Sequence, residues 1–343
     1  MTTLLQSVRV VAYRGIEHLE LADLTPVTLI LGSNNSGKTS ILEAMSLLLR
    51  APDPSQWVHL ARQRDLDIPL EDALWALFPG GAWMSLENGP QQSRKVELAG
   101  VLGGAKREVS ATGLASLSWG GTEQEEITLR IEVLIDGTKS TLEFNRTSPA
   151  QWAAGRVFKV FTATSAGHRS TRGFVEHLSH VVADGKKGLA VELAQLFDSD
   201  VEDLDVVDLS GRRSVRVKHK ARGVVDLASF GDGLRRAVLF SLMLSRAGGG
   251  ALLIDELEVG IHPTLMRTVY LRLCEAARAV QAQLILTTHS LEAVDAILGA
   301  AEGSDRQDSL SAFWVQRKDG LHEARRYDFA KLSMLREAGL DIR

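Results

Sequence analysis

The segment that most constrains the fold of this chain is Gly32-Ser33-Asn34-Asn35-Ser36-Gly37-Lys38-Thr39. It fits the pattern G-x-x-x-x-G-K-S/T without a gap. The apolar run at residues 27–31 precedes it, and residues 41–49 follow it with apolar side chains at helical spacing. A buried strand, a glycine-bracketed loop and a helix in this order predict a phosphate-binding loop beside a mainly parallel sheet. We call residues 32–39 the phosphate loop.

The residue types of the phosphate loop suit a nucleoside triphosphate. Glycine lets the backbone curve closely around phosphate groups, and the amides at the start of the following helix attract anions. Lys38 is expected to reach the β- and γ-phosphates, and Thr39 is expected to ligate Mg²⁺. We therefore expect ATP and Mg²⁺ as ligands, and we include the next residue, Ser40, in the binding segment.

Two acidic residues follow a second apolar strand at residues 251–254. In an open α/β sheet, ligands bind at the carboxyl ends of the strands, where Asp255 and Glu256 would lie. Asp255 is expected to hold Mg²⁺, directly or through water. Glu256 is expected to act as the general base that polarises the attacking water.

A second anion site is predicted at Ser229-Phe230-Gly231-Asp232-Gly233, which opens a long apolar helix. Ser229 and the amides of Gly231 and Gly233 would face an anion there. A single γ-phosphate needs only one such site, and the phosphate loop already supplies it. The second site therefore fits the nucleotide of another copy of the chain. The alternative is an ordinary helix start with Ser229 near the N-cap position.

His289, in Thr287-Thr288-His289-Ser290, directly follows another apolar strand. A histidine at this place could contact the γ-phosphate or the attacking water. The alternative is a histidine with a purely structural role. Because it lies one strand beyond Asp255 and Glu256 along the chain, we take the functional interpretation.

Alternating helices and strands from residue 231 onward predict a parallel α/β core. The expected strands there are 251–254 and 283–288, and the expected helices are 263–280 and 290–299. We predict a P-loop α/β head, residues 1–343, with an inserted mainly β lobe at 51–150 and a helical and β lobe at 151–230. Further expected elements are strands at 5–12, 18–21 and 157–161, helices near 70–77, 172–183 and 187–197, strands within 201–227, and a hairpin at 311–327.

Composition excludes several other classes of protein. Hydrophobic residues make up 45% of the chain and charged residues 24%, which is ordinary for a globular protein. The formal net charge of −4 gives no global attraction to nucleic acid or membrane, and no apolar run reaches the roughly 18 residues that a membrane span needs. Cys274 is the single cysteine, so an intrachain disulfide is excluded. We expect a cytoplasmic protein.

Taken in order, these segments resemble the Walker A, signature, Walker B and switch-histidine motifs of the ABC ATPase superfamily. More narrowly, Asp255 to Pro263 and Thr287 to Ser290 look like the ATPase heads of the overcoming-lysogenization-defect (OLD) family. Tyr13-Arg14-Gly15 and the ending at residues 337–343 are similar to that group too. The chain ends before the nuclease domain of OLD nucleases could begin, so we expect a stand-alone head. We call residues 229–233 the signature segment; it departs from the Leu-Ser-Gly-Gly-Gln of transporters, and no Q-loop glutamine is identified.

The resemblance implies an ATP hydrolase that acts as a nucleotide-driven switch. Its expected partners are a second copy of the chain and a separate effector protein encoded nearby, as in bacterial anti-phage systems. The main alternative is a DNA-binding repair ATPase similar to RecF, and a further one is a scaffold that binds ATP with little turnover. Arg212, Arg213, Arg216, Lys218, Lys220 and Arg222 form a basic stretch that could contact DNA, but we favour a solvated face balanced by the acidic residues at 198–205.

Overall fold

The computed structural model describes residues 3–64, 67–80, 91–119, 125–144, 157–302 and 307–342. These residues form two six-stranded sheets, a three-stranded sheet and the helices that cover them. The predicted boundary between residues 150 and 151 lies outside the described residues. Within the described part, no helix is both long and apolar enough to cross a bilayer.

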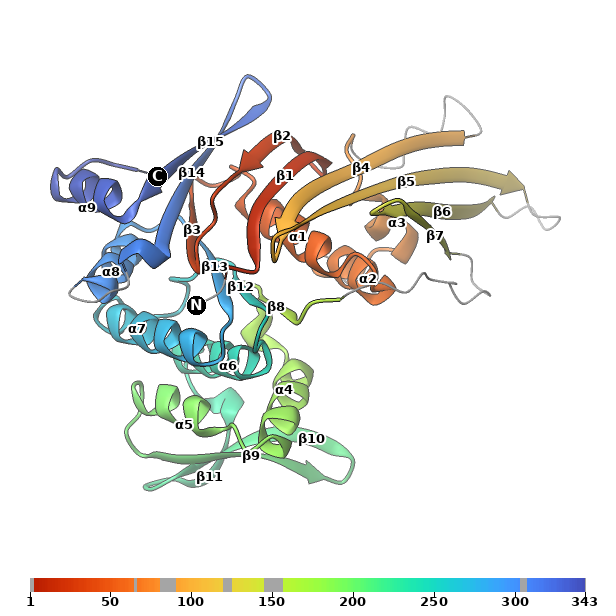
Figure 1. Ribbon diagram of the computed structural model, residues 1–343. Coiled ribbons are helices and arrows are strands. Elements are labelled where there is room, and N and C mark those ends of the chain that lie inside the picture. The colour runs from red at the N-terminus through yellow and green to blue at the C-terminus, as the bar shows by residue number, and fades with distance from the viewer. Residues whose placement is uncertain are drawn as a thin grey trace.

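The core sheet has the order β15-β14-β3-β13-β12-β8 and carries the predicted phosphate loop (Figure 1). Neighbouring strands from β8 to β14 run parallel, and only β15 runs antiparallel to its neighbour. The strands are β3 (Val27–Leu31), β8 (Val160–Ala163), β12 (Ala251–Ile254), β13 (Gln283–Thr288), β14 (Leu310–Lys318) and β15 (Leu321–Asp328). The predicted parallel α/β core is confirmed.

Alternate residues of the central strands belong to two separate hydrophobic cores. Leu29 and Leu31 of β3 pack into a core with α6 (Asp232–Arg246), α7 (Pro263–Ala279) and α8 (Leu291–Ala301), whereas Ile30 packs into a second core with α1 (Lys38–Arg50). The strands β12 and β13 divide in the same way. Because successive side chains of a strand point to opposite faces, a sheet covered on both sides requires the uninterrupted apolar runs seen in the sequence.

The second sheet is wholly antiparallel and has the order β2-β1-β4-β5-β6-β7. Its strands are β1 (Leu5–Tyr13), β2 (Ile16–Leu21), β4 (Gln91–Leu102), β5 (Ala105–Trp119), β6 (Glu125–Ile135) and β7 (Thr138–Phe144). The strand β4 pairs directly with β1 from the start of the chain, so the β lobe shares one sheet with the N-terminal strands. Among the described residues, the strands that follow residue 51 begin at Gln91. The described residues before them include the helices α2 (Pro54–Arg62) and α3 (Leu70–Trp75).

The structure departs from the prediction at two elements, β8 and α2. The strand expected at 157–161 is β8 at Val160–Ala163, where it pairs with β12 and leaves Val157 exposed. The helix α2 was not predicted, because it lies in the segment 51–150 that was expected to be mainly β. Pro54 instead occupies the first turn, where its missing N–H is harmless, and the Asp53 side chain accepts from the Ser55 amide at 3.0 Å as an N-cap.

The third sheet lies beyond α6, at the far side from the β lobe (Figure 1). It has the order β11-β10-β9 and packs with α4 and α5. Both helices begin and end within two residues of their predicted limits. The bounds are α4 (Thr171–Ala183), α5 (Gly188–Gln195), β9 (Val201–Leu209), β10 (Arg212–His219) and β11 (Gly223–Asp226), with short 3₁₀ turns η2 (Gly167–Arg169), η3 (Leu227–Ser229) and η4 (Gln307–Ser309) and a final α9 (Phe329–Glu337).

Candidate functional site

The phosphate loop joins the carboxyl end of β3 to the start of α1. Asn35 and Gly37 both adopt the left-handed region, with φ of 63° and 90°. At Gly37 the backbone also lies against the His322 imidazole, since a Cβ there would be 3.1 Å from its Nε2. Ser33, Asn34 and Asn35 are exposed, whereas Ser36 is buried inside the loop. The tip of the loop is therefore exposed and leads into the N-terminus of α1, where no side chain caps the helix and the free amides favour an anion.

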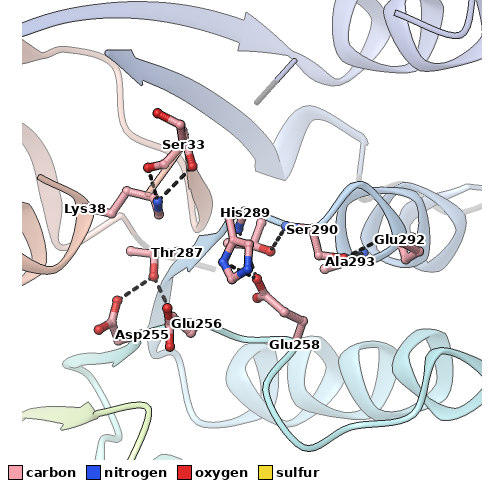
Figure 2. A network of polar contacts seen from close by, with 12 residues as sticks. Ser33, Lys38, Asp255, Glu256, Glu258, Thr287, His289, Ser290, Glu292 and Ala293 are labelled. Carbon is pink, nitrogen blue, oxygen red and sulfur yellow. Dashed lines mark hydrogen bonds and ion pairs between the residues drawn. The ribbon is translucent and has the colours of Figure 1, made fainter. Parts of the chain in front are cut away.

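Lys38 turns back over the phosphate loop. Its Nζ donates to the carbonyl oxygens of Gly32 and Ser33, at 2.8 Å each, and the side chain is buried (Figure 2). Burial lowers the pKa of Lys38 below its ordinary value, and the nearby carboxylates of Asp255, Glu258 and Glu256 oppose that shift. A cation held by neutral carbonyls can transfer its hydrogen bonds to a phosphate, where charge-assisted bonds are stronger.

A chain of hydrogen bonds links the phosphate loop to the carboxyl end of β12. The Thr39 hydroxyl donates to Asp255 Oδ2 at 2.9 Å, and the Thr287 hydroxyl donates to Asp255 Oδ1 at 2.6 Å. Thr287 also accepts from the Glu256 amide at 2.9 Å (Figure 2). Thr39, Asp255 and Glu256 were predicted to act together, and the structure brings them together. Thr287 was quoted in the sequence motif, but its role as the residue that fixes both acids was missed.

Thr39 and Asp255, the residues predicted to bind the metal ion, both offer oxygen atoms, the class of ligand that Mg²⁺ prefers. Both oxygens of the buried Asp255 carboxylate are already oriented by threonine hydroxyls, one of which is the proposed ligand Thr39. The donor set therefore fits Mg²⁺ held between the phosphate loop and β12.

Glu256 is held in an unusual backbone conformation. Its φ of 49° is rare for a residue with a side chain. Beneath it, the fully buried Arg236 of α6 donates to the Asp255 and Glu256 carbonyl oxygens at 3.0 and 2.7 Å. Such strain persists only where surrounding contacts impose it and is common at functional sites. Sequence reasoning did not assign Arg236 a role, since only the fold shows that it spans from α6 to β12.

His289 lies where β13 ends, next to Glu258. Its Nδ1 and its amide nitrogen are each 3.0 Å from Glu258 Oε1 (Figure 2). The side chain of Glu258 is nearly buried, whereas that of His289 is 40% exposed. The adjacent Ser290 caps α8 by accepting from the Ala293 amide at 3.2 Å. Glu258 thus holds the His289 backbone amide and lies against the imidazole, which stays partly exposed.

Ser40 contacts a cluster of charged residues that does not include Lys38, Asp255 or Glu256. Its hydroxyl accepts from Arg64 at 2.8 Å, and Arg64 also binds the buried Glu43 carboxylate at 2.8 Å. Arg14, from the predicted aromatic–arginine–glycine segment, donates to Glu43 at 2.6 Å. The N-terminal strands are thereby tied to α1. Arg64 and Glu43 were not singled out from the sequence.

The signature segment lies apart from the residues that surround Asp255. Ser229 and Gly231 are exposed, and a Cβ on Gly231 would meet nothing within 4 Å. Gly233 is different: it is buried, and a Cβ there would collide with the Gly260 carbonyl oxygen and lie 2.9 Å from Phe197. Its lack of a side chain therefore serves close packing of α6 against the loop after β12.

Four members of the basic stretch pair with acidic residues in or next to the third sheet. Their partners include Glu202 for Lys218, Asp198 for Arg222, Asp226 for Arg216 and Asp208 for Arg213, at 2.8–3.7 Å. The preferred interpretation, a face balanced by acidic neighbours, is supported. His219 Nδ1 accepts from the Ala221 and Arg222 amides, and its Nε2 lies 3.1 Å from Asp198. Asp198, Asp200 and His219 are close enough together to hold a metal ion, but these hydrogen bonds already use both ring nitrogens of His219.

The fold and this site define an α/β P-loop ATPase head with a mainly parallel core sheet and an antiparallel β lobe. A crystal structure of the Smc head bound to the C-terminal winged-helix domain of ScpA is similar, with a TM-score of 0.52 and 13% identity over 96% of this chain and 99% of that chain. An Smc head bound to the C-terminal domain of ScpA from Pyrococcus furiosus gives a TM-score of 0.51 and 11% identity over 98% and 99%. At such identities the likeness shows the fold alone.

Sequence comparisons place the chain among ATPase domains. Residues 139–295 match the family described as "AAA domain, putative AbiEii toxin, Type IV TA system", and residues 4–78 match "AAA ATPase domain". The "Uncharacterized protein MJECL11" of Methanocaldococcus jannaschii is 30% identical over 115 residues, which are 33% of this chain and 98% of that protein. The chain carries an AAA-type ATPase domain and belongs to the same family as this archaeal protein.

Proposed function

We propose that this protein hydrolyses ATP with Mg²⁺ at a site that two copies of the chain complete together. The observation that carries the proposal is the contrast between two anion sites on one chain. The phosphate loop is linked to Asp255 through Thr39 at 2.9 Å. The exposed Ser229 and Gly231 precede α6, and no phosphate loop of the same chain is bonded to them. A second head would bring its nucleotide to that free helix start.

The described residues support a division of labour in hydrolysis. Lys38 would exchange the carbonyls of the loop for the β- and γ-phosphates, and Thr39 and Asp255 would hold Mg²⁺, which neutralises charge on the phosphates. Glu256 would accept a proton from the water whose oxygen attacks the γ-phosphorus, while the bond to the ADP oxygen breaks. His289, whose backbone amide is bound by Glu258, would contact the γ-phosphate. Ser229 and the Gly231 amide of the other copy would cap the same group.

At the level of the cell, we propose a nucleotide-driven switch in bacterial anti-phage defence, acting in the cytoplasm beside a separate effector. Support comes from the match to a family described with the AbiEii toxin and a toxin–antitoxin system, and from the resemblance to stand-alone OLD-like heads. Smc heads of similar fold bind domains of ScpA, which is consistent with a partner protein here. The basic stretch, paired with its acidic neighbours, does not favour the RecF-like alternative.

The closure step is testable through the Glu256→Gln variant. ATP with Mg²⁺ should convert this variant into a stable pair, because the bound γ-phosphate is no longer hydrolysed, and ADP should not. Light scattering after size separation measures the mass. Adding Ser229→Arg should block ATP-dependent closure by steric bulk while calorimetric ATP binding to each head remains. Equal masses with ATP and ADP, in a variant that binds both, would argue against nucleotide-driven closure.

A further inference from the structure

The turn η2 (Gly167–Arg169) is fixed against the start of α6, directly beside the signature segment. Arg235 of α6 donates to the His168 carbonyl at 2.6 Å, and Arg236 donates to the Ser165 carbonyl at 2.6 Å. Because both arginines belong to the first turns of α6, these bonds join the segment 165–169 to the helix start, and we treat the two as one unit. Arg236 also binds the carbonyls at the end of β12, so this unit is connected to the proposed catalytic acid.

Three basic side chains surround one carboxylate at this helix start. Asp232, the first residue of α6, lies 3.2 Å from His168 Nε2, 3.6 Å from Arg169 and 3.6 Å from Arg235. The His168 contact, and then the charges around it, lower the pKa of Asp232. His168 is only 1% exposed, and its Nδ1 has no hydrogen-bond partner among the described residues. The carboxylate thus has two guanidinium groups, those of Arg169 and Arg235, each 3.6 Å away, and it keeps one of them if the other moves.

Arg169 is the member of this cluster that is free to leave it. Its side chain is 71% exposed, and the ion pair to Asp232 at 3.6 Å is longer than a charge-assisted hydrogen bond. An exposed pair of this kind contributes little stability. Asp232 would keep His168 and Arg235 if Arg169 moved. Through its ion pair with Asp232, Arg169 lies next to the exposed Gly231 of the signature segment. No described contact joins it to Lys38, Asp255 or Glu256 of its own chain.

We infer that Arg169 is an arginine finger supplied in trans. When two heads close, it leaves Asp232 and donates to the γ-phosphate of the ATP held by the other copy's phosphate loop. The inference rests on the proposed shared site and adds a catalytic residue to it. A guanidinium suits this task because its planar fork can bind two phosphate oxygens and stabilise the charge that develops as the γ-phosphoryl group transfers.

The first test is the hydrolysis rate of Arg169→Ala at saturating ATP. We expect a loss of about 10² or more, since arginine fingers in other nucleotide hydrolases are worth about 10³ to 10⁵. ATP affinity of the isolated head should stay within about twofold. The matched control is Arg172→Ala, which removes an exposed charge three residues away and should keep near-normal turnover. Wild-type turnover of Arg169→Ala would overturn the inference.

Mixing decides whether Arg169 acts on its own nucleotide or on that of the partner. Arg169→Ala and Lys38→Ala chains, each impaired alone, can form one intact site from the phosphate loop of the first and the Arg169 and signature segment of the second. After exchange is proven with differently tagged copies, we expect about a quarter of wild-type activity, because half of random pairs are mixed and each holds one good site. No recovery would show action within one chain and overturn the inference.

A reference pair separates this failure from failure of the shared site itself. Ser229→Arg mixed with Lys38→Ala should recover activity by the same geometry, without involving Arg169. Recovery of the reference pair alone would reject the arginine finger and keep the shared site. Absence of recovery in both mixtures, with exchange proven, would reject the shared site and the inference with it.

Discussion

The phosphate loop and the signature segment are both helix starts with bare amides, yet the protein treats them differently. The phosphate loop is complete within the chain: Lys38 is satisfied by two carbonyls, and Thr39 is bonded to Asp255. The signature segment leaves Ser229 and Gly231 exposed, with open space around Gly231. A site shared between two copies needs two parts from each copy. One part is a phosphate loop that binds the nucleotide, and the other is an exposed helix start that can contact the nucleotide of the partner.

The largest expected effect is loss of nucleotide binding in Lys38→Ala. A hydrogen bond to a charged group is worth about 1.5–3 kcal/mol, and Lys38 would lose contacts to two phosphates, so ATP affinity should fall by about 100-fold or more. Calorimetric titration measures it, with Lys187→Ala, a lysine held by Asp203 and Asp205, as the control. Unchanged affinity in a folded variant would remove the phosphate loop from the comparison.

The next effect separates binding from chemistry at the same edge of the core sheet. Glu256→Gln should keep ATP binding and slow hydrolysis by about 10² to 10⁴, the usual contribution of a positioned general base. Steady-state phosphate release measures the rate, and Glu292→Gln serves as a control at an exposed carboxylate in the first turn of α8. A loss smaller than tenfold would mean that another group activates the water, with His289 the first to examine.

Thr287→Val tests the hydroxyl that orients both acids. Its loss leaves a buried Asp255 oxygen and the Glu256 amide without their partner, which should reduce the free energy of unfolding by about 1–3 kcal/mol. Hydrolysis should fall by about 10- to 100-fold, as for other residues that orient metal ligands. Thr288→Val is the matched control, because its buried hydroxyl bonds the Ser290 amide instead. Equal rate losses in the two variants would refute the assigned role of Thr287.

The smallest effect divides the two glycines of the signature segment. Gly233→Ala should lower the free energy of unfolding by about 1–3 kcal/mol, because its Cβ would overpack the Gly260 loop. Gly231→Ala, with open space and a φ of −64°, should leave stability nearly unchanged. Denaturant melts compare them. If both variants lose the same stability, packing does not distinguish the buried glycine from the exposed one.

Much of the core sheet was predictable because its signals are local. The phosphate loop, the apolar strands and the alternating helices follow from residue spacing within short windows, and the elements from Asp232 to Thr288 lie within a few residues of their predicted limits. The strand β8 was misplaced because its register is set by pairing with β12, far along the chain. The joining of β1 to β4 likewise depends on contacts that no local pattern carries.

The candidate site divides in the same way. Lys38, Thr39, Asp255 and Glu256 stand in recognisable motifs, whereas Arg236 acts by reaching carbonyls 19 and 20 residues away in sequence. From the sequence, Gly231 and Gly233 were predicted to share one role. Their neighbours in the structure differ, because Gly231 has open space around it whereas Gly233 packs against Gly260. The structure also puts His168 and Arg169 beside the start of α6, where both contact Asp232.

The claim that two copies share each site is tested most directly by rescue between inactive chains. Lys38→Ala lacks a working phosphate loop, and Ser229→Arg lacks a working signature segment, so neither should hydrolyse ATP alone. A mixed pair holds one intact site, built from the phosphate loop of the Ser229→Arg chain and the signature segment of the Lys38→Ala chain. Phosphate release is measured after subunit exchange is shown. Partial recovery is the predicted result; background activity despite proven exchange would contradict the shared site.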